Sequence, residues 1–405
     1  MSNNLQNERF LSIIDHLSKV PFYRDKLRLA GIDLKYIKGL EDLPAIPFTT
    51  KSELRESDLP YRSPLSFDQL EFIFSSSGTS GSPTYYFWTH TDTEVLRDVG
   101  GRFMRRIGIT KHDLALVIAP LGLSVMWYCM VQQYNAAGSG VITLGVQPPD
   151  VILECLAEHP VTVLITLPVV ATRLAEYASV RRPELLPSIQ LGQVHCGGDF
   201  LSEGRRRRIE AAWGARCYNY LGMSEIFGPF AGEGPERRGL CLAGDYVHAE
   251  VIDPQTKQPV EPGCSGVAVY TTLWPKGAPL LRYWSDDYVA MEHPAIDDNP
   301  LEPHLRYLGR SRDRLARGPD AVFAQDIENV LLAHDTIGNE WQLTLDGKSR
   351  AIVRAEGMSP DHAALADIRN TIGELIGRRG VVEICPPGTL PRDIPKPERI
   401  VQSGG

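Results

Sequence analysis

The chain of 405 residues is long for one hydrophobic core, so we expect a large domain and at least one smaller domain. With 43% hydrophobic and 23% charged residues it has the composition of a globular protein, and its formal net charge of -8 argues against a nucleic-acid or membrane-surface binder. The seven cysteines include no CxxC pair, and the start MSNNLQNERF lacks the pattern of a secretory signal. These features favour reduced thiols and a cytoplasmic location.

In the first half of the chain, apolar β-rich runs alternate with helical patterns. The runs are 115–119, 141–144 and 161–167, and the helical patterns are 150–158 and 169–178. This alternation predicts a parallel sheet covered by helices. The uncharged stretch from Leu114 to Val131 is interrupted by Pro120, Gly122 and Ser124, so we interpret it as a buried strand, a loop and the start of a core helix rather than a membrane span.

The second half of the chain has three further features. A basic cluster, Arg205 to Arg208, follows Leu201-Ser202-Glu203 and predicts the solvated face of a helix. From Tyr246, short strands separated by turns predict a β-rich subdomain. After Arg310 the pattern predicts a small unit with helices at 323–333 and 361–377 and a strand pair near 341–353, and residues 386–405 predict an irregular tail.

The stretch SSSGTSGSPT, Ser75 to Thr84, follows a strand-like run and consists largely of small residues. Its backbone N–H groups and hydroxyls suit phosphate oxygens, which indicates a phosphate loop. The chain has no lysine between Lys51 and Lys111, so charge neutralisation must come from a metal or from distant residues. Ser82 stands where a nucleophile elbow requires glycine, which disfavours a serine hydrolase.

Several motifs in register resemble one known family. SSGTSGSPT resembles the phosphate-binding signature of the adenylate-forming superfamily, which includes acyl-CoA synthetases, luciferases and peptide-synthetase adenylation domains. The stretches VPFYRDKLRLAGID, LEDLPAIPFTTKSELRE, LGMSE, TTLWPKGAPLLRYWSDD and LPRDIPKPERIV are similar to the phenylacetate-CoA ligase family in the expected order. The resemblance covers nearly the whole chain.

The resemblance implies an α/β fold with two domains. A large N-terminal domain, residues 1–310, would bind ATP and the acyl group with parallel sheets flanked by helices and a β-rich subdomain. A small mobile α+β domain, residues 311–405, would carry the catalytic lysine and rotate about Arg312 between two half-reactions.

The resemblance also implies the nucleotide site. Glu225 would hold Mg2+, since a hard cation prefers carboxylate oxygen, and Ser224 would bind phosphate or the acyl-adenylate. Lys396 would place its ammonium over the α-phosphate and the carboxylate. The residues implied for the β- and γ-phosphates are Ser77, Thr79, Ser80 and Gly81. Those implied for ribose, adenine or the neighbouring loop are Gly198, Asp199, Asp287, Arg310 and Leu221, the last in place of an aromatic residue that stacks on adenine.

An aromatic carboxylate is the expected acid, because the implied acyl pocket is apolar and aromatic. Its residues are Trp127, Tyr128, Gly197, Phe227 and Gly228. A possible metal group of His248, Cys241 and Glu233 matches no metal motif in its spacing.

The implied function is an ATP- and Mg2+-dependent ligase that forms an acyl-adenylate and transfers the acyl group to a thiol, with CoA as co-substrate. Three alternatives stay open: transfer to a carrier protein or an amine, a nucleotidyltransferase that puts AMP on a cofactor hydroxyl, and a nucleotide-binding relative without turnover. The partner is a small carboxylic acid, with a carrier protein and a homodimer left open, and with neither nucleic acid nor membrane expected.

Overall fold

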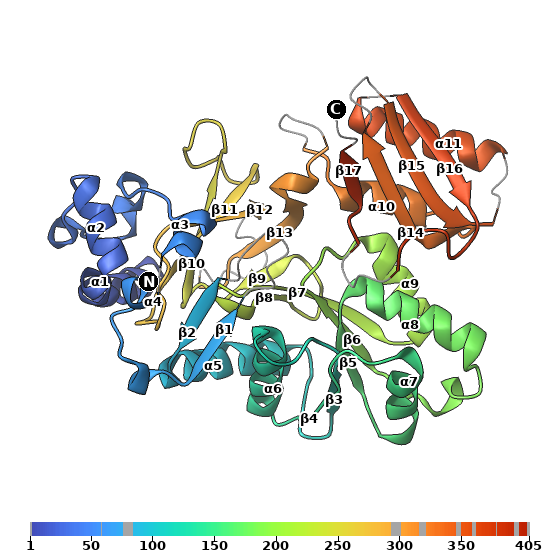
Figure 1. Cartoon of the computed structure of the whole chain (residues 1–405), viewed down its shortest axis with the longest axis horizontal. Coiled ribbons are helices and arrows are strands. Elements are labelled where there is room, and N and C mark those ends of the chain that lie inside the picture. The colour runs from blue at the N-terminus through green and yellow to red at the C-terminus, as the bar shows by residue number, and fades with distance from the viewer. Residues whose placement is uncertain are drawn as a thin grey trace. The chain divides into compact units, whose positions relative to one another are not determined.

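We describe the protein from a computed structural model, for residues 2–57, 59–75, 84–292, 301–315, 321–345, 350–358, 362–377, 379–392 and 397–402. The chain forms two compact units, and each consists of two separate segments (Figure 1). The first unit contains Met1–Val146 and Asn219–Tyr307, and the second contains Gln147–Tyr218 and Leu308–Gly405.

The first unit contains a β-rich half and a helical half. Its helices are α1 (Ser2–Lys19), α2 (Pro21–Leu29), α3 (Lys51–Glu56), α4 (Leu59–Arg62), α5 (His90–Arg106) and α6 (Val125–Ala137), with 3-10 turns η1 (Leu34–Tyr36), η2 (Leu40–Ala45) and η3 (Phe67–Gln69). Its strands are β1 (Phe72–Ser75), β2 (Tyr85–Trp88), β3 (Leu114–Val117), β4 (Gly140–Thr143), β8 (Phe227–Glu233), β9 (Leu240–Leu242), β10 (Val247–Ile252), β11 (Ser265–Thr272) and β12 (Tyr283–Met291). Strands β7 (Arg216–Met223) and β13 (His304–Arg310) contain residues of both units.

Strand pairing in this unit matches the predicted change from parallel strands early in the chain to a β-rich region from Tyr246. Strands β3 and β4 pair in parallel, with Ala115 opposite Val141. The later strands form the order β10-β11-β12-β13-β9-β8-β7, in which β10, β11 and β12 pair antiparallel and β8 pairs antiparallel with β7 and β9. The β-rich subdomain predicted from Tyr246 is therefore confirmed.

The second unit consists of a segment of alternating helices and strands and a second segment that forms a small α/β layer. Its first segment contains α7 (Pro149–Glu158), β5 (Val163–Thr166), α8 (Pro168–Arg181), η4 (Leu186–Ser188), β6 (Gln193–Gly197) and α9 (Glu203–Trp213). Its second segment contains η5 (Ser311–Asp313), α10 (Ala324–Leu332), β14 (Ile337–Leu345), β15 (Arg350–Gly357), α11 (His362–Ile376), β16 (Arg379–Cys385) and β17 (Ile400–Gln402). Strands β5 and β6 are parallel, which confirms the predicted parallel arrangement.

The second segment has its own sheet and core. Its sheet has the order β16-β15-β14-β17, with β15 antiparallel to β14 and parallel to β16. Ile327 and Leu331 of α10 and Ile368 and Ile372 of α11 are buried in one cluster with Trp341 of the sheet. The mixed α/β fold is confirmed, whereas the boundary at residue 311 and the mobility of residues 311–405 remain predictions.

Leu114 to Val131 forms β3, a loop and the start of α6, as predicted. None of the helices in the described part of the chain has both the length and the apolar character needed to cross a membrane.

The prediction of a solvated helix face at the basic cluster is wrong for Arg205 and Arg206, whereas Arg207 is exposed. Arg205 and Arg206 on α9 are buried, with relative exposures of 2% and 5%. Helix α9 packs closely on α10, since a Cβ atom added at Gly204 would lie 2.8 Å from Leu332 Cβ. Arg208 donates through Nη2 to the carbonyl of His334 at 3.0 Å. Part of the cluster therefore belongs to a buried interface within the second unit.

The prediction of an irregular tail is also wrong in part. Residues Ile400–Gln402 form β17, which pairs in parallel with β14 and places Ile400 opposite Leu343. Ile400 is buried in the same core as Leu343. A single apolar pair inside a charged, proline-rich stretch supplied too weak a pattern to predict this strand.

Candidate active site

The turn between β7 and β8 carries Glu225. The two strands approach so closely that a Cβ atom added at Gly222 would lie 2.4 Å from Gly228 Cα, so glycine is required there. The Ile226 N–H donates to the Met223 carbonyl at 3.2 Å and closes the turn. Gly228, predicted to line the acyl pocket, thus has a packing role; its contact with substrate remains a prediction.

Glu225 is 5% exposed, and Tyr283 and Lys51 are polar neighbours of its carboxylate among the described residues. Its Oε1 accepts a hydrogen bond from the Tyr283 hydroxyl at 3.0 Å and lies 3.1 Å from Lys51 Nζ. Burial, followed by the negative charge of Glu225, raises the pKa of Tyr283 well above its usual value. The same two causes, in the same order, raise the pKa of Tyr86.

Lys51 reaches Glu225 because residues 47–50 lie beside β12. The Thr49 N–H donates to Arg282 O at 2.8 Å, and the Trp284 N–H donates to Thr49 O at 2.8 Å. Thr50 then caps α3 in a capping box with Glu53, so Lys51 is the first residue of the helix. Sequence reasoning missed Lys51 as a site residue, although the Thr-Lys-Ser-Glu pattern predicts the helix start.

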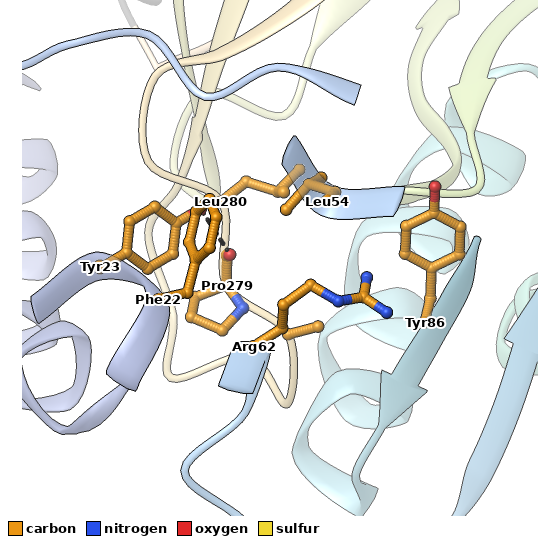
Figure 2. A pocket seen from close by; sticks show the side chains of 8 residues that line it. Phe22, Tyr23, Leu54, Arg62, Tyr86, Pro279 and Leu280 are labelled. Carbon is orange, nitrogen blue, oxygen red and sulfur yellow. Dashed lines mark hydrogen bonds between the residues drawn. The ribbon is translucent and has the colours of Figure 1, made fainter. Parts of the chain in front are cut away.

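The first unit contains a small cavity that Tyr86 helps to line. Its lining residues are Phe22, Tyr23, Leu54, Arg62, Tyr86, Ala278, Pro279 and Leu280. Figure 2 shows the Arg62 side chain extending across the cavity toward Tyr86. The cavity volume is about 10 Å3, which is room for about one water molecule. It is too small to hold an acyl group.

Asp287, the predicted ribose ligand, lies on β12 beyond Tyr283. The pairing of β11 with β12 shifts at this point, because Val267 is opposite Tyr288 whereas Val269 is opposite Trp284. The extra residues form a bulge in which Ser285 Oγ donates to Ala268 O at 2.7 Å. Asp287 is 5% exposed and accepts a long hydrogen bond of 3.5 Å from the Tyr307 hydroxyl. One strand thus carries Asp287 and the tyrosine that binds Glu225.

The aromatic residues predicted to bind the acyl group are mostly buried. The Tyr128 ring lies 4.3 Å from the Phe72 ring, and its hydroxyl donates to Glu71 Oε1 at 3.3 Å. Burial raises the pKa of Tyr128 to about 12. Phe227 is fully buried and its ring lies 5.7 Å from that of Trp274. Trp127 is half-buried on α6 and donates through Nε1 to Gly122 O at 3.1 Å. Their contacts with substrate remain predictions.

Leu221 lies on the strand before the same turn, and Ser224 is the first residue of the turn. Leu221 lies on β7 opposite Ala231 and is 8% exposed. Its neighbour Tyr220 points into the core, where its hydroxyl lies 3.5 Å from Met104 Sδ. Ser224 is half-buried directly before Glu225. Their roles in adenine and phosphate binding stay predictions.

The remaining described site residues belong to the second unit. Gly197 ends β6 and Gly198 has a φ of 78°, which favours glycine. Asp199 accepts a hydrogen bond from the Phe200 N–H at 2.9 Å. Arg310 ends β13 and Arg312 lies in η5, and both side chains are exposed. Burial raises the pKa of Asp313, and the Asp199 charge contributes to the same direction. Asp199 therefore lies within electrostatic reach of the segment that contains Arg310 and Arg312.

Five predicted residues lie outside the described residues: Ser77, Thr79, Ser80, Gly81 and Lys396. Among the described residues, no three or more His, Cys, Asp or Glu side chains gather closely enough to hold a metal ion. His248, Cys241 and Glu233, named above as a possible metal group, therefore do not form a metal site. Mg2+ bound with a nucleotide usually takes one or two carboxylates, with phosphates and water supplying the other ligands. Glu225, a nearly buried carboxylate at a turn, fits that role.

Comparison with known proteins identifies the family. The model of the family described as AMP-binding enzyme matches residues 29–272. The chain is 29% identical to phenylacetate-coenzyme A ligase of Thermus thermophilus, over 96% of this chain and 93% of that protein. It is 23% identical to the Escherichia coli protein of the same name, over 98% and 93% of the two chains.

Among solved structures, 2-hydroxyisobutyryl-CoA ligase in complex with 2-HIB-AMP superposes with a TM-score of 0.88 and 22% identity, over 99% of this chain and 89% of that chain. This likeness shows the fold. The family match covers more than half of the chain, and the chain therefore belongs to the family of AMP-binding enzymes.

Proposed function

We propose that the protein is an ATP-dependent, AMP-forming acid–CoA ligase that activates an aromatic carboxylic acid. The observation that carries this proposal is the match of residues 29–272 to the AMP-binding enzymes. Relatives that align over nearly the full chain are named phenylacetate-coenzyme A ligases, which supports CoA as the acceptor and an aromatic acid as the substrate.

In the first half-reaction, a carboxylate oxygen attacks the α-phosphorus of ATP, and the bond to pyrophosphate breaks. The protein contributes mainly position and charge to such a transfer. Lys51 places a positive charge close to the predicted metal ligand Glu225. The phosphate loop itself contains no lysine, so this charge comes from another segment. Glu225 would hold Mg2+, which neutralises phosphate charge when bound. Asp287 would accept the ribose hydroxyls, and Lys396 would act at the α-phosphate.

In the second half-reaction, the sulfur of CoA attacks the acyl carbonyl, and AMP leaves with the electron pair of the broken bond. The predicted rotation about Arg312 would exchange the groups that face the adenylate between the two steps. Transfer to a carrier-protein thiol uses the same chemistry and is the second candidate. A homodimer and a cytoplasmic location remain part of the proposal.

The test is pyrophosphate release from ATP across a panel of aryl, arylacetic, fatty and amino acids, with and without CoA. Release with an aryl or arylacetic acid, together with consumption of CoA, is the expected result. Release without CoA consumption would favour a carrier protein or an amine as acceptor. A stable adenylylated product on a hydroxyl would identify a nucleotidyltransferase. No release with any acid, from protein that binds ATP, would refute the ligase.

A further inference from the structure

The Glu225 carboxylate carries a cation in this structure, the ammonium of Lys51. Lys51 Nζ lies 3.1 Å from Glu225 Oε1, the same oxygen that accepts the hydrogen bond from the Tyr283 hydroxyl at 3.0 Å. The Glu225 side chain is 6% exposed, and a carboxylate removed from water in this way is costly unless an opposite charge lies beside it. Lys51 therefore supplies a charge that compensates the buried carboxylate.

The two members of this pair differ in their freedom to move. Glu225 lies in the turn whose strands approach so closely that a Cβ atom added at Gly222 would lie 2.4 Å from Gly228 Cα. The Lys51 side chain is 42% exposed, and a flexible stem separates its ammonium from a backbone that the capping box of α3 holds in place. The pair can therefore open by rotation of the Lys51 side chain into water, whereas Glu225 stays in its turn.

The strand that follows the predicted phosphate loop lies within electrostatic reach of Glu225. Strand β2 begins at Tyr85, directly after Thr84, the last residue of the stretch SSSGTSGSPT. Tyr86 on this strand is 1% exposed, and its pKa is raised first by burial and then by the negative charge of Glu225. The carboxylate thus acts on the strand that leaves the segment whose composition suits phosphate.

Two cations cannot share the Glu225 carboxylate at low cost. A divalent cation that binds it must displace the Lys51 ammonium, because neighbouring positive charges repel each other strongly where little water surrounds them. When the cation arrives with phosphate groups, their negative charges attract both the cation and the displaced ammonium. Displacement is therefore unfavourable for a free metal ion and favourable for a metal ion bound to a nucleotide.

We propose that Lys51 is a selectivity residue of the cation site at Glu225, where its ammonium competes with a divalent metal ion and gives way to a metal ion that carries phosphate. The inference rests on the proposed function, in which Glu225 holds Mg2+. It adds that the protein itself neutralises this carboxylate until the nucleotide arrives. The chain then binds free metal weakly and metal with nucleotide tightly.

The test measures binding of Mn2+ alone, an oxygen-binding ion with an EPR signal, to Lys51→Met and to the matched control Lys35→Met. Lys35 also has an exposed side chain and pairs with a carboxylate, since its Nζ lies 2.6 Å from Asp33 Oδ2, so each variant loses one paired positive charge. Lys51→Arg keeps the charge, and Lys51→Gln is a second neutral variant in case the methionine variant does not fold. The double variant Lys51→Met/Glu225→Gln removes both partners. Each titration is repeated with a non-hydrolysable ATP analogue.

Without nucleotide, Lys51→Met should bind Mn2+ about tenfold more tightly than the wild type, because a charged partner no longer competes for the carboxylate. Lys51→Gln should show the same gain, whereas Lys51→Arg and Lys35→Met should resemble the wild type. The double variant should lose the gain, which would locate the ion at Glu225. With the ATP analogue, Lys51→Met should bind Mn2+ no more tightly than the wild type, because the phosphates have lost a cation.

The inference is overturned if Lys51→Met and Lys51→Gln bind Mn2+ alone no more tightly than the wild type, or if Lys35→Met shows the same gain. It is also overturned if the gain survives in the double variant or remains with the ATP analogue. A wild type that releases no pyrophosphate with any acid refutes the proposed function instead. The titrations without nucleotide still decide whether Lys51 and a metal ion compete for Glu225.

Discussion

Replacing Glu328 with alanine should strongly destabilise the second unit. The carboxylate is 1% exposed and accepts hydrogen bonds from Arg205 Nε at 2.9 Å and Arg205 Nη2 at 2.6 Å. It also accepts from Ser202 Oγ at 2.6 Å and from Trp341 Nε1 at 2.8 Å. The substitution removes all of these acceptor atoms while Arg205 keeps its buried charge. Breaking a buried pair in this way costs about 3–5 kcal/mol.

The dependence of stability on pH gives a second, independent value for the contribution of Glu328 to the stability of the second unit. Burial alone would raise the pKa of Glu328, but Arg205 outweighs burial and lowers it from 4.5 to about 2. A carboxyl whose pKa is lowered in the folded state stabilises the fold when the pH is above the ordinary carboxyl pKa of 4.5. This stabilisation is lost as the pH falls from 4.5 through about 2. The difference corresponds to about 3 kcal/mol.

The assay is native-state hydrogen exchange of α9, α10 and β14, because a chain with two units does not guarantee two-state unfolding. Glu328→Ala should lower the opening free energy of these elements by about 3–5 kcal/mol. The double variant Arg205→Met/Glu328→Leu, which removes both charges, should lose much less and should lose the acid dependence between pH 4.5 and about 2. If the double variant loses as much stability as Glu328→Ala, the cost does not come from the unpaired charge of Arg205.

Four substitutions test the first unit. Glu225→Gln should lower the kcat of pyrophosphate release by about a hundredfold with little change in thermal stability, and an active variant would remove Glu225 from the metal site. Lys51→Met and Asp287→Asn should each raise the KM for ATP by about tenfold, measured by initial rates, because each loses one charged interaction; an unchanged KM for either would show that its side chain does not contact the nucleotide. Gly222→Ala should destabilise the protein by about 1–3 kcal/mol in thermal unfolding, because its methyl group would clash with Gly228, and full stability would contradict the close strand approach.

The sequence alone was sufficient for the fold class, the parallel and β-rich regions and the family. These properties depend on local patterns: alternating apolar runs predict β3, β4 and β5, and a contiguous motif places Glu225 in a turn. Short motifs of this kind remain recognisable because the chemistry requires particular residues close together in the chain.

Only the tertiary structure decided which distant residues meet. A run of arginines looks the same in sequence on a solvated helix and in a buried interface, and Arg205 is buried because the partner carboxylate comes from Glu328, far along the chain. Lys51 beside Glu225 and Arg173 beside Glu340 are likewise contacts between separate segments. Their energies come from packing that removes water around paired charges, and the composition or periodicity of one segment carries no information on that packing.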